Sequence, residues 1–142
     1  IVILEEPGVV GLSAYGVLPV VDQLDALAKK RRNNVSFTSV GYGVQEINPV
    51  FIQEDLVRMV AHPRLIQINV PGFTGDFSLL LSNNHSTGGT CFGDSGGPNF
   101  LGDSDVIAGV TSFTLNGNCA GTGGVFRLDR QDVLDFVTPF LN

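Results

Sequence analysis

Glycine is the residue that most restricts the folds open to this chain. Eighteen of the 142 residues are glycine, roughly twice the usual share. They follow no collagen period and form no Gly/Ser tracts, so they are expected to serve turns and close backbone approaches. This distribution is typical of a β-rich protein, and 142 residues are enough for one domain.

Composition excludes several classes of protein. Charged residues make up 15% of the chain and hydrophobic residues 43%, which excludes an intrinsically disordered protein. With a net charge of −6, the chain has no overall basic character of the kind that phosphate backbones and anionic lipids require, so we expect no nucleic acid and no membrane as partner. The uncharged residues 106–126 hold Asn and Gly in their middle and predict loop and strand. No ligand-spaced His, Cys, Asp or Glu cluster occurs in the sequence, so no metal and no cofactor is predicted.

Several segments have the composition of β-strands. They are separated by clusters of Gly, Asn, Asp and Pro and cover residues 36–44, 64–70, 77–82, 106–115 and 123–128. Five or six strands at this spacing predict a barrel or a sandwich. Residues 129–141 place Val133, Phe136, Val137 and Phe140 at helical spacing, which predicts an amphipathic helix that Pro139 ends.

The first 32 residues show a different pattern. Residues 1–4 are apolar and predict a strand that enters from something upstream, as if the chain had been cut there. Residues 9–21 are apolar but interrupted by Gly and Pro, which favours an extended connector. A short helix is expected over residues 22–32, with Asp22 as its N-cap. The basic run at residues 29–32 is interpreted as the solvated end of that helix, with a processing site as the alternative.

One short segment has the pattern of a catalytic nucleophile. Residues 93–97 fit Gly-x-Ser-x-Gly, in which glycines let backbone N–H groups converge beside the serine hydroxyl. A glycine-rich turn is the alternative. No histidine follows His85, which excludes the α/β-hydrolase order of Ser, acid and His. His62, Asp76 and Ser95 have the order of an internal triad, but both histidines lie in turn-like segments and are interpreted as solvated.

The residues around this serine extend the pattern. The segment Cys91-Phe92-Gly93-Asp94-Ser95-Gly96-Gly97-Pro98 resembles the nucleophile motif of the chymotrypsin/trypsin-like serine endopeptidases. Further parts are similar to that family's connector, Gly-Trp-Gly strand, substrate-wall strand, return strand and C-terminal helix: residues 18–19, 40–43, 110–114, 124–126 and 129–141. The resemblance implies an all-β fold, a six-stranded antiparallel Greek-key barrel with a C-terminal α-helix, over residues 20–142. Residues 1–19 would be a residual strand of a first barrel and the interdomain connector.

The resemblance also implies roles for the nucleophile segment. Ser95 would be the nucleophile, the N–H groups of Gly93 and Ser95 the oxyanion donors, and Asp94 the carboxylate that holds the loop. Cys91 and Cys119 would form a disulfide, with free buried thiols as the alternative. The family's catalytic His and Asp motifs are absent, so a missing N-terminal barrel would supply both groups, and the chain alone is predicted to be inactive.

Substrate contacts follow from the same resemblance. They are expected from Gly89, Thr90, Phe92, Ser112, Phe113, Thr114 and Gly124. Gly89 stands at the pocket floor, where proteases selecting Lys or Arg carry Asp. Thr114 stands where wide pockets have Gly, and Gly124 is expected to leave the facing wall open. These positions predict a preference for small or medium uncharged side chains.

The implied partners are polypeptide substrates, the N-terminal barrel and protein protease inhibitors, in a secreted protein. A non-catalytic binding module and a first barrel on a separate chain are the alternatives. Ile1-Val2 also matches the terminus that these proteases expose on activation and insert against the Asp of the nucleophile motif, but Glu5 and Glu6 disfavour that interpretation. The sequons at Asn34 and Asn84 are glycosylation motifs on which no other prediction depends.

Overall fold

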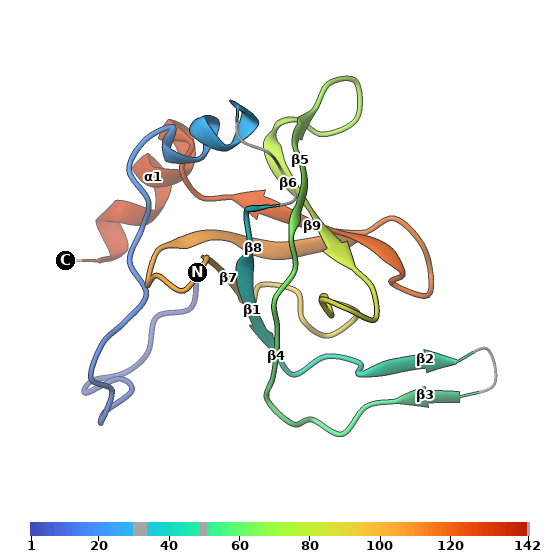
Figure 1. Ribbon diagram of the computed structural model, residues 1–142. Coiled ribbons are helices and arrows are strands. Elements are labelled where there is room, and N and C mark those ends of the chain that lie inside the picture. Colours follow the sequence, from blue (N-terminus) through green and yellow to red (C-terminus); the bar gives the residue numbers. More distant parts are fainter. Residues whose placement is uncertain (30–33, 49–50, 142) are drawn as a thin grey trace.

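The computed structural model describes residues 1–29, 34–48 and 51–141. Within them the fold is an antiparallel seven-stranded sheet in the order β4-β1-β7-β8-β9-β6-β5 (Figure 1). Its strands are β1 (Phe37–Gly41), β4 (Met59–Ala61), β5 (Leu65–Val70), β6 (Gly75–Asn83), β7 (Pro98–Leu101), β8 (Ile107–Thr114) and β9 (Gly121–Arg127). A separate hairpin joins β2 (Glu46–Asn48) to β3 (Phe51–Gln53). The all-β antiparallel prediction with a C-terminal helix is confirmed.

The strand count differs from the predicted six because one run of chain is interrupted. Pro63 is fully buried between β4 and β5 and has no N–H to donate to a ladder. An antiparallel bridge between Ser36 and Arg64 joins the start of β1 to the start of β5. The two ends of the sheet therefore meet, and β4 and β5 together take the place of one bent strand in the curled sheet.

The observed strands lie close to the predicted ones, with four additions. Strands β1, β5, β6, β8 and β9 fall within or beside the five predicted segments. The strands that the sequence did not predict are β2, β3, β4 and β7, each of which has only three or four residues. Segments this short lack the alternation on which strand prediction depends.

The core lies inside the curled sheet. Its buried side chains are Leu24, Leu27, Phe37, Leu65, Ile68, Leu79, Leu81, Ala108 and Val125. Most project from strands, where alternate residues face the same side. Leu24 and Leu27 come instead from η1 (Gln23–Lys29), a 3-10 helix that covers one end of the barrel.

The N-terminal region departs from two predictions. Residues 1–4 form no strand in the structure and are exposed, because no neighbouring strand pairs with them in the described chain. The predicted helix over residues 22–32 is a 3-10 helix over Gln23–Lys29, and residues 30–33 of the basic run lie outside the described residues. Asp22 has a positive φ of 56°, and its carboxylate binds Arg130 instead of capping the helix.

A buried arginine joins η1 to the end of β9. Arg127 is fully buried and donates from Nε and Nη2 to the carboxylate of Asp129, at 2.9 and 2.8 Å. Its Nη2 also donates to Asp25 in η1 at 2.7 Å, and its Nη1 to Asn69 at 2.9 Å. Asp129, equally buried, accepts the Leu24 N–H at 2.7 Å. Within this Arg127 cluster, Asp129 therefore provides the side-chain cap at the start of η1 that the sequence predicts for Asp22.

The Arg127 guanidinium stays charged in this site. Burial by itself would lower the pKa of Arg127, but the hydrogen bonds and charges of Asp129 and Asp25 outweigh it and raise that pKa above its ordinary value. A cation of such high pKa does not titrate across the ordinary pH range.

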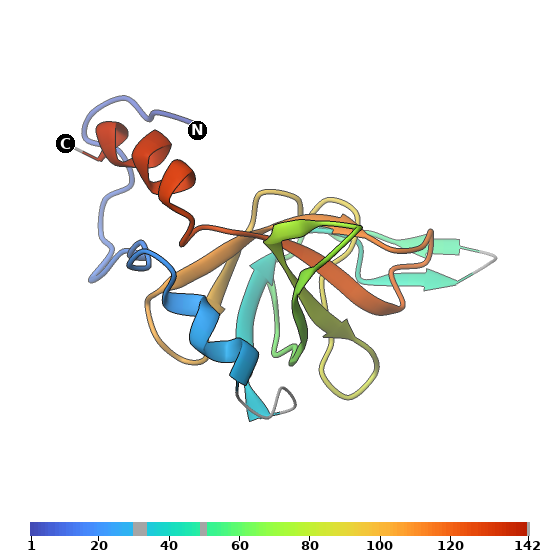
Figure 2. The ribbon, with the colours of Figure 1, turned by 90° about the horizontal axis from the view of Figure 1, so that it is seen from above.

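The C-terminal segment is helical. It consists of α1 (Gln131–Val137) and the 3-10 turn η3 (Thr138–Phe140). Helical structure therefore continues through Pro139, which the sequence predicts as the end of the helix. Figure 2 shows α1 and both termini at the end of the molecule opposite the β2–β3 hairpin. Among the described residues, no helix has the length and apolar character needed to cross a bilayer.

Candidate active site

The loop that carries Ser95 is formed by two successive tight turns. Asp94 N–H donates to the Cys91 carbonyl at 3.1 Å, and Gly97 N–H donates to the Asp94 carbonyl at 2.9 Å. Gly93 and Gly96 have φ values of +95° and +84°, which favour glycine. Ser95 lies between them with its side chain exposed to solvent.

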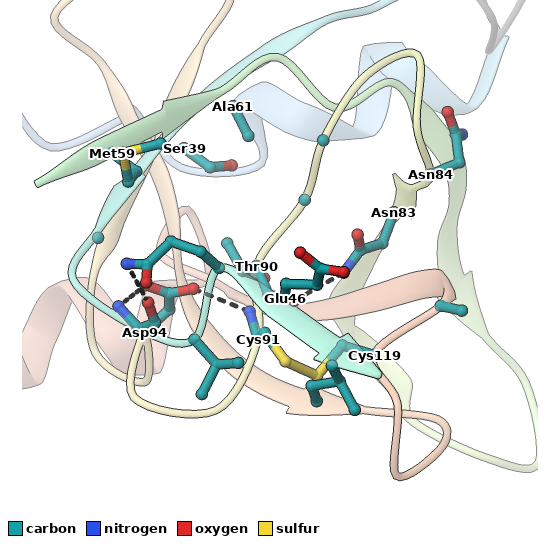
Figure 3. A pocket seen from close by; sticks show the side chains of 18 of the residues that line it. Ser39, Glu46, Met59, Ala61, Asn83, Asn84, Thr90, Cys91, Asp94 and Cys119 are labelled. Atoms are coloured by element: carbon teal, nitrogen blue, oxygen red, sulfur yellow. Dashed lines mark hydrogen bonds between the residues drawn. A yellow bond between two sulfur atoms is a disulfide. The ribbon is translucent and has the colours of Figure 1, made fainter. Parts of the chain in front are cut away.

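The Asp94 carboxylate holds this loop against the segment that follows β1. Oδ1 accepts the Gly43 N–H and Oδ2 accepts the Cys91 N–H, each at 2.8 Å (Figure 3). A Cβ on Gly43 would lie 2.6 Å from the Phe92 carbonyl oxygen and 2.7 Å from Asp94 Cγ, and one on Gly41 would overlap the same carboxylate. The two glycines of residues 40–43 therefore make room for Asp94.

Two backbone donors at the Ser95 loop have no acceptor among the described residues. Neither the Gly93 N–H nor the Ser95 N–H donates to any acceptor in the part of the chain that the structure describes. These are the two groups expected to act as oxyanion donors. Unpaired N–H groups next to an exposed hydroxyl can stabilise a developing negative charge on a bound carbonyl oxygen.

The loop is also fastened to β8. Gly96 N–H donates to the Thr111 carbonyl at 2.8 Å, and Thr111 N–H donates to the Gly97 carbonyl at 2.9 Å. The disulfide predicted between Cys91 and Cys119 is confirmed, and it ties the other end of the loop to the β8–β9 connection. Ser95 is thus held between a strand and a covalent link.

A cavity of about 420 Å³ lies behind the nucleophile loop. Gly89, Thr90, Cys91, Asp94 and Cys119 contribute to its wall on the loop side. β1, β4 and the segment entering β2 form the other wall (Figure 3). The predicted residues around Ser95 therefore divide into two groups, one facing this cavity and one facing solvent or the outer sheet surface.

The end of β8 provides the second group. A bulge between Thr111 and Phe113 makes Phe113 pair with Gly124 and Thr114 with Gly123. Ser112 is exposed at this bulge, and Phe92 on the loop is 48% exposed.

The wall at Gly124, which the sequence predicts to be open, is covered by a side chain. A Cβ on Gly124 would overlap three ring carbons of Phe113, so that ring covers the glycine. The Phe73 ring in turn packs against Phe113 in a T-shaped arrangement, with ring centroids 6.1 Å apart. The bulge causes this arrangement, because it places Phe113 directly opposite Gly124 and on the same face.

The structure does not bring the internal triad together. Nδ1 of His62 lies 3.4 Å from Thr38 Oγ1, and the Asp76 carboxylate forms an ion pair with Arg130 at 2.6 Å. Neither side chain contacts Ser95 within the described residues. Ile1 is 63% exposed and does not contact Asp94. The described ranges also hold no group of three or more His, Cys, Asp or Glu side chains that could bind a metal ion.

Two features of the site were missed from the sequence. The function of Gly41 and Gly43 could have been found, because two glycines one residue apart at a strand end signal a close backbone approach. Asn83 lines the cavity beside Gly89, but an asparagine before Asn84 at a strand end reads only as a turn signal.

Comparison with known proteins identifies the family. The trypsin family model matches residues 21–134. The chain belongs to the trypsin family. Among trypsin-family relatives, the collagenase of Hypoderma lineatum is 30% identical over 86 residues, which make up 61% of this chain and 33% of that protein.

Solved structures have the same fold. HL collagenase superposes with a TM-score of 0.62 at 22% identity, covering 86% of this chain and 51% of that one. A variant of human heparin binding protein gives 0.59 at 18%, covering 86% and 48%. A scabies mite inactivated protease paralogue gives 0.59 at 14%, covering 89% and 51%. This chain thus spans a third of the curated trypsin-family relative and about half of each solved structure.

Proposed function

We propose that this chain is the nucleophile-bearing half of a secreted serine endopeptidase, and that an N-terminal barrel supplies the catalytic His and Asp. In this reaction the imidazole takes the proton of Ser95 as Oγ attacks a peptide carbonyl carbon. The C–N bond breaks, the amine leaves with that proton, and water then hydrolyses the ester on Ser95. The disulfide supports an oxidising, extracellular setting.

One observation carries this proposal. Ser95 is exposed on a loop whose shape the Asp94 carboxylate fixes through two N–H donors, while the N–H groups of Gly93 and Ser95 stay unpaired in the described chain. A merely structural turn has no need of two free donors beside a hydroxyl, whereas acyl transfer uses both to stabilise the oxyanion. Gly93, Asp94 and Ser95 are therefore assigned to the catalytic machinery.

The proposal is tested on the full-length natural protein with a fluorophosphonate probe. We expect covalent labelling of Ser95 and cleavage of peptide substrates, both abolished by Ser95→Ala and unaffected by Ser13→Ala, which changes an exposed serine in the connector. The isolated 142-residue chain should react far more slowly, because it lacks the barrel proposed to supply the catalytic His and Asp.

A non-catalytic binding module is the second candidate. The covered wall at Gly124 favours it, because a filled pocket does not accept a substrate side chain. Full-length protein that neither reacts with the probe nor cleaves any peptide in a panel would establish this alternative and refute the endopeptidase.

A further inference from the structure

An exposed turn directly after β6 carries one of the two sequons. Asn84-His85-Ser86 fits the pattern Asn-x-Ser, with a residue other than proline in the middle, which is the acceptor motif for N-linked glycans. All three residues are exposed, and the N–H groups of Thr87 and Gly88 close the turn on the Asn84 carbonyl at 3.2 and 2.8 Å. The motif therefore lies on the surface, as a site for a bulky sugar chain must.

The turn uses only the oxygen atoms of Asn84. Its Oδ1 accepts the N–H groups of Ser86 and Thr87 at 2.9 and 3.3 Å, which forms an Asx-turn. Its Nδ2 donates to no acceptor among the described residues, and Figure 3 shows the side chain directed away from Asn83. An N-glycosidic bond is made at Nδ2 and leaves Oδ1 as a carbonyl acceptor. A glycan on Asn84 would therefore preserve both of these hydrogen bonds.

The Ser86 hydroxyl is likewise not used by the turn. It makes no hydrogen bond within the described part of the chain, whereas the neighbouring Thr87 hydroxyl bonds to Ser82 Oγ at 2.8 Å and donates to the Gly88 carbonyl at 3.0 Å. The preceding asparagine also differs, because Asn83 Nδ2 donates to a backbone carbonyl at 2.8 Å. The sequon thus combines an amide nitrogen and a hydroxyl that the described fold leaves without partners.

We propose that Asn84 is an N-glycosylation site of this protein. This inference rests on the secreted setting in the proposed function, and not on catalysis by Ser95. In the transfer, Asn84 Nδ2 attacks the anomeric carbon of an oligosaccharide that is carried on a lipid pyrophosphate. The new C–N bond forms as the bond from that carbon to the pyrophosphate oxygen breaks. The amide releases one proton to a base of the transferring enzyme, and the lipid pyrophosphate leaves.

The full-length natural protein, secreted from eukaryotic cells, tests the proposal. Mass spectrometry of its peptides should find an N-linked oligosaccharide on Asn84. Peptide N-glycosidase treatment in heavy-oxygen water should convert the Asn84 side chain to an isotope-labelled carboxylate. Ser86→Ala should abolish this glycan and lower the intact mass by one oligosaccharide. The melting temperature of the deglycosylated protein should not change in this variant, because the Ser86 hydroxyl has no partner in the described fold.

Two further variants provide matched controls. Ser86→Thr keeps the motif and should keep the glycan on Asn84. Ser36→Ala removes the other sequon, Asn34-Val35-Ser36, and should leave the glycan on Asn84 unchanged.

The outcomes separate this inference from the proposed function. A secreted, folded protein whose Asn84 is unmodified overturns the inference and leaves the endopeptidase untouched, as does an intact mass that Ser86→Ala lowers only by one oxygen atom. A glycan on Asn84 in a protein that does not react with the fluorophosphonate at Ser95 would leave the modification site standing and refute the endopeptidase. A full-length protein that does not enter the secretory pathway overturns both the secreted setting and the inference, whatever the reactivity of Ser95.

Discussion

At the scale of single residues, the site requires glycine at positions 41 and 43 because there is no room for a side chain, and not because of a positive φ. Gly43 is buried and has an ordinary φ, yet the Phe92 carbonyl and Asp94 lie where its side chain would be. The carboxylate can approach the Gly43 N–H only because no Cβ stands between them. The absence of one carbon thus fixes the position of the residue before the nucleophile.

Gly43→Ala should therefore displace Asp94 and misplace Ser95. We expect the rate of fluorophosphonate labelling of the full-length protein to fall at least tenfold, and the free energy of unfolding to fall by about 1–3 kcal/mol, as for overpacked sites. Gly117→Ala is the control, because no atom lies within 4 Å of its Cβ position. Equal labelling rates in the two variants would show that Gly43 does not position the loop.

At the scale of elements, the Arg127 cluster joins parts of the chain that no backbone ladder connects. It links η1 to the strand end at Arg127 and to Asp129, which precedes α1. Arg127 and Asp129 are both fully buried, whereas the side chain of Asp25 is 54% exposed. The buried Arg127–Asp129 pair should therefore dominate the cluster, because exposed ion pairs contribute little.

Arg127→Met should be strongly destabilising, because it leaves the Asp129 carboxylate buried without a counter-ion. Losing one partner of a buried pair costs about 3–5 kcal/mol, which urea unfolding monitored by circular dichroism would measure. Arg130→Met is the matched control, since its partners Asp22 and Asp76 are each more than half exposed and these ion pairs should be worth at most about 1 kcal/mol. A similar loss in both variants would contradict the special role of the buried pair.

The Cys91–Cys119 disulfide fastens the nucleophile loop to the β8–β9 connection, across a sequence separation of 28 residues. Replacing both cysteines with serine should lower the free energy of unfolding by about 3.5 kcal/mol on the chain-entropy estimate. Guanidinium unfolding of the oxidised protein gives the comparison, and the reduced wild-type protein is the control. An unchanged unfolding midpoint would mean that other contacts already restrain this segment.

Elements with a local signal could be predicted from the sequence. β8 and β9 are long strands of eight and seven residues, and the nucleophile segment has a specific motif, so each was located from the sequence. Arg127 was not recognised, because a charged residue at a strand end normally faces solvent. Asp129 is only two residues away, but Asn69 and Asp25 reach Arg127 from distant elements, and no short segment encodes those two contacts. The covering of Gly124 likewise depends on a bulge in β8 that the residue pattern does not reveal.

At the scale of the whole molecule, the N-terminal arm lacks a packed surface of its own. Large apolar side chains at Ile1, Val2, Ile3, Val10 and Leu12 are each more than half exposed. Within the described residues, this arm, residues 1–17, forms a backbone bridge to the sheet at Val17, which pairs in parallel with Val106. An exposed apolar segment of this kind favours association with another apolar surface.

The isolated 142-residue chain should therefore self-associate, and removal of residues 1–12 should reverse this. Multi-angle light scattering at rising protein concentration would show a growing molar mass for the first protein and a monomer for the second. The shorter chain keeps Val17 and its bridge, so its fold serves as the control, checked by circular dichroism. A monomeric 142-residue chain over the same concentrations would contradict the prediction.

The strand order also sets the time at which the sheet can form during synthesis. β1 lies between β4 and β7, and its pairing of Thr38 with Phe100 spans about sixty residues. On a growing chain, one side of β1 stays without its neighbour until residues 98–101 have left the ribosome. Such long-range pairing is slow, typically in the millisecond to second range. β1, which leads into Gly41 and Gly43, can therefore pair with β7 only after the nucleophile loop has been synthesised.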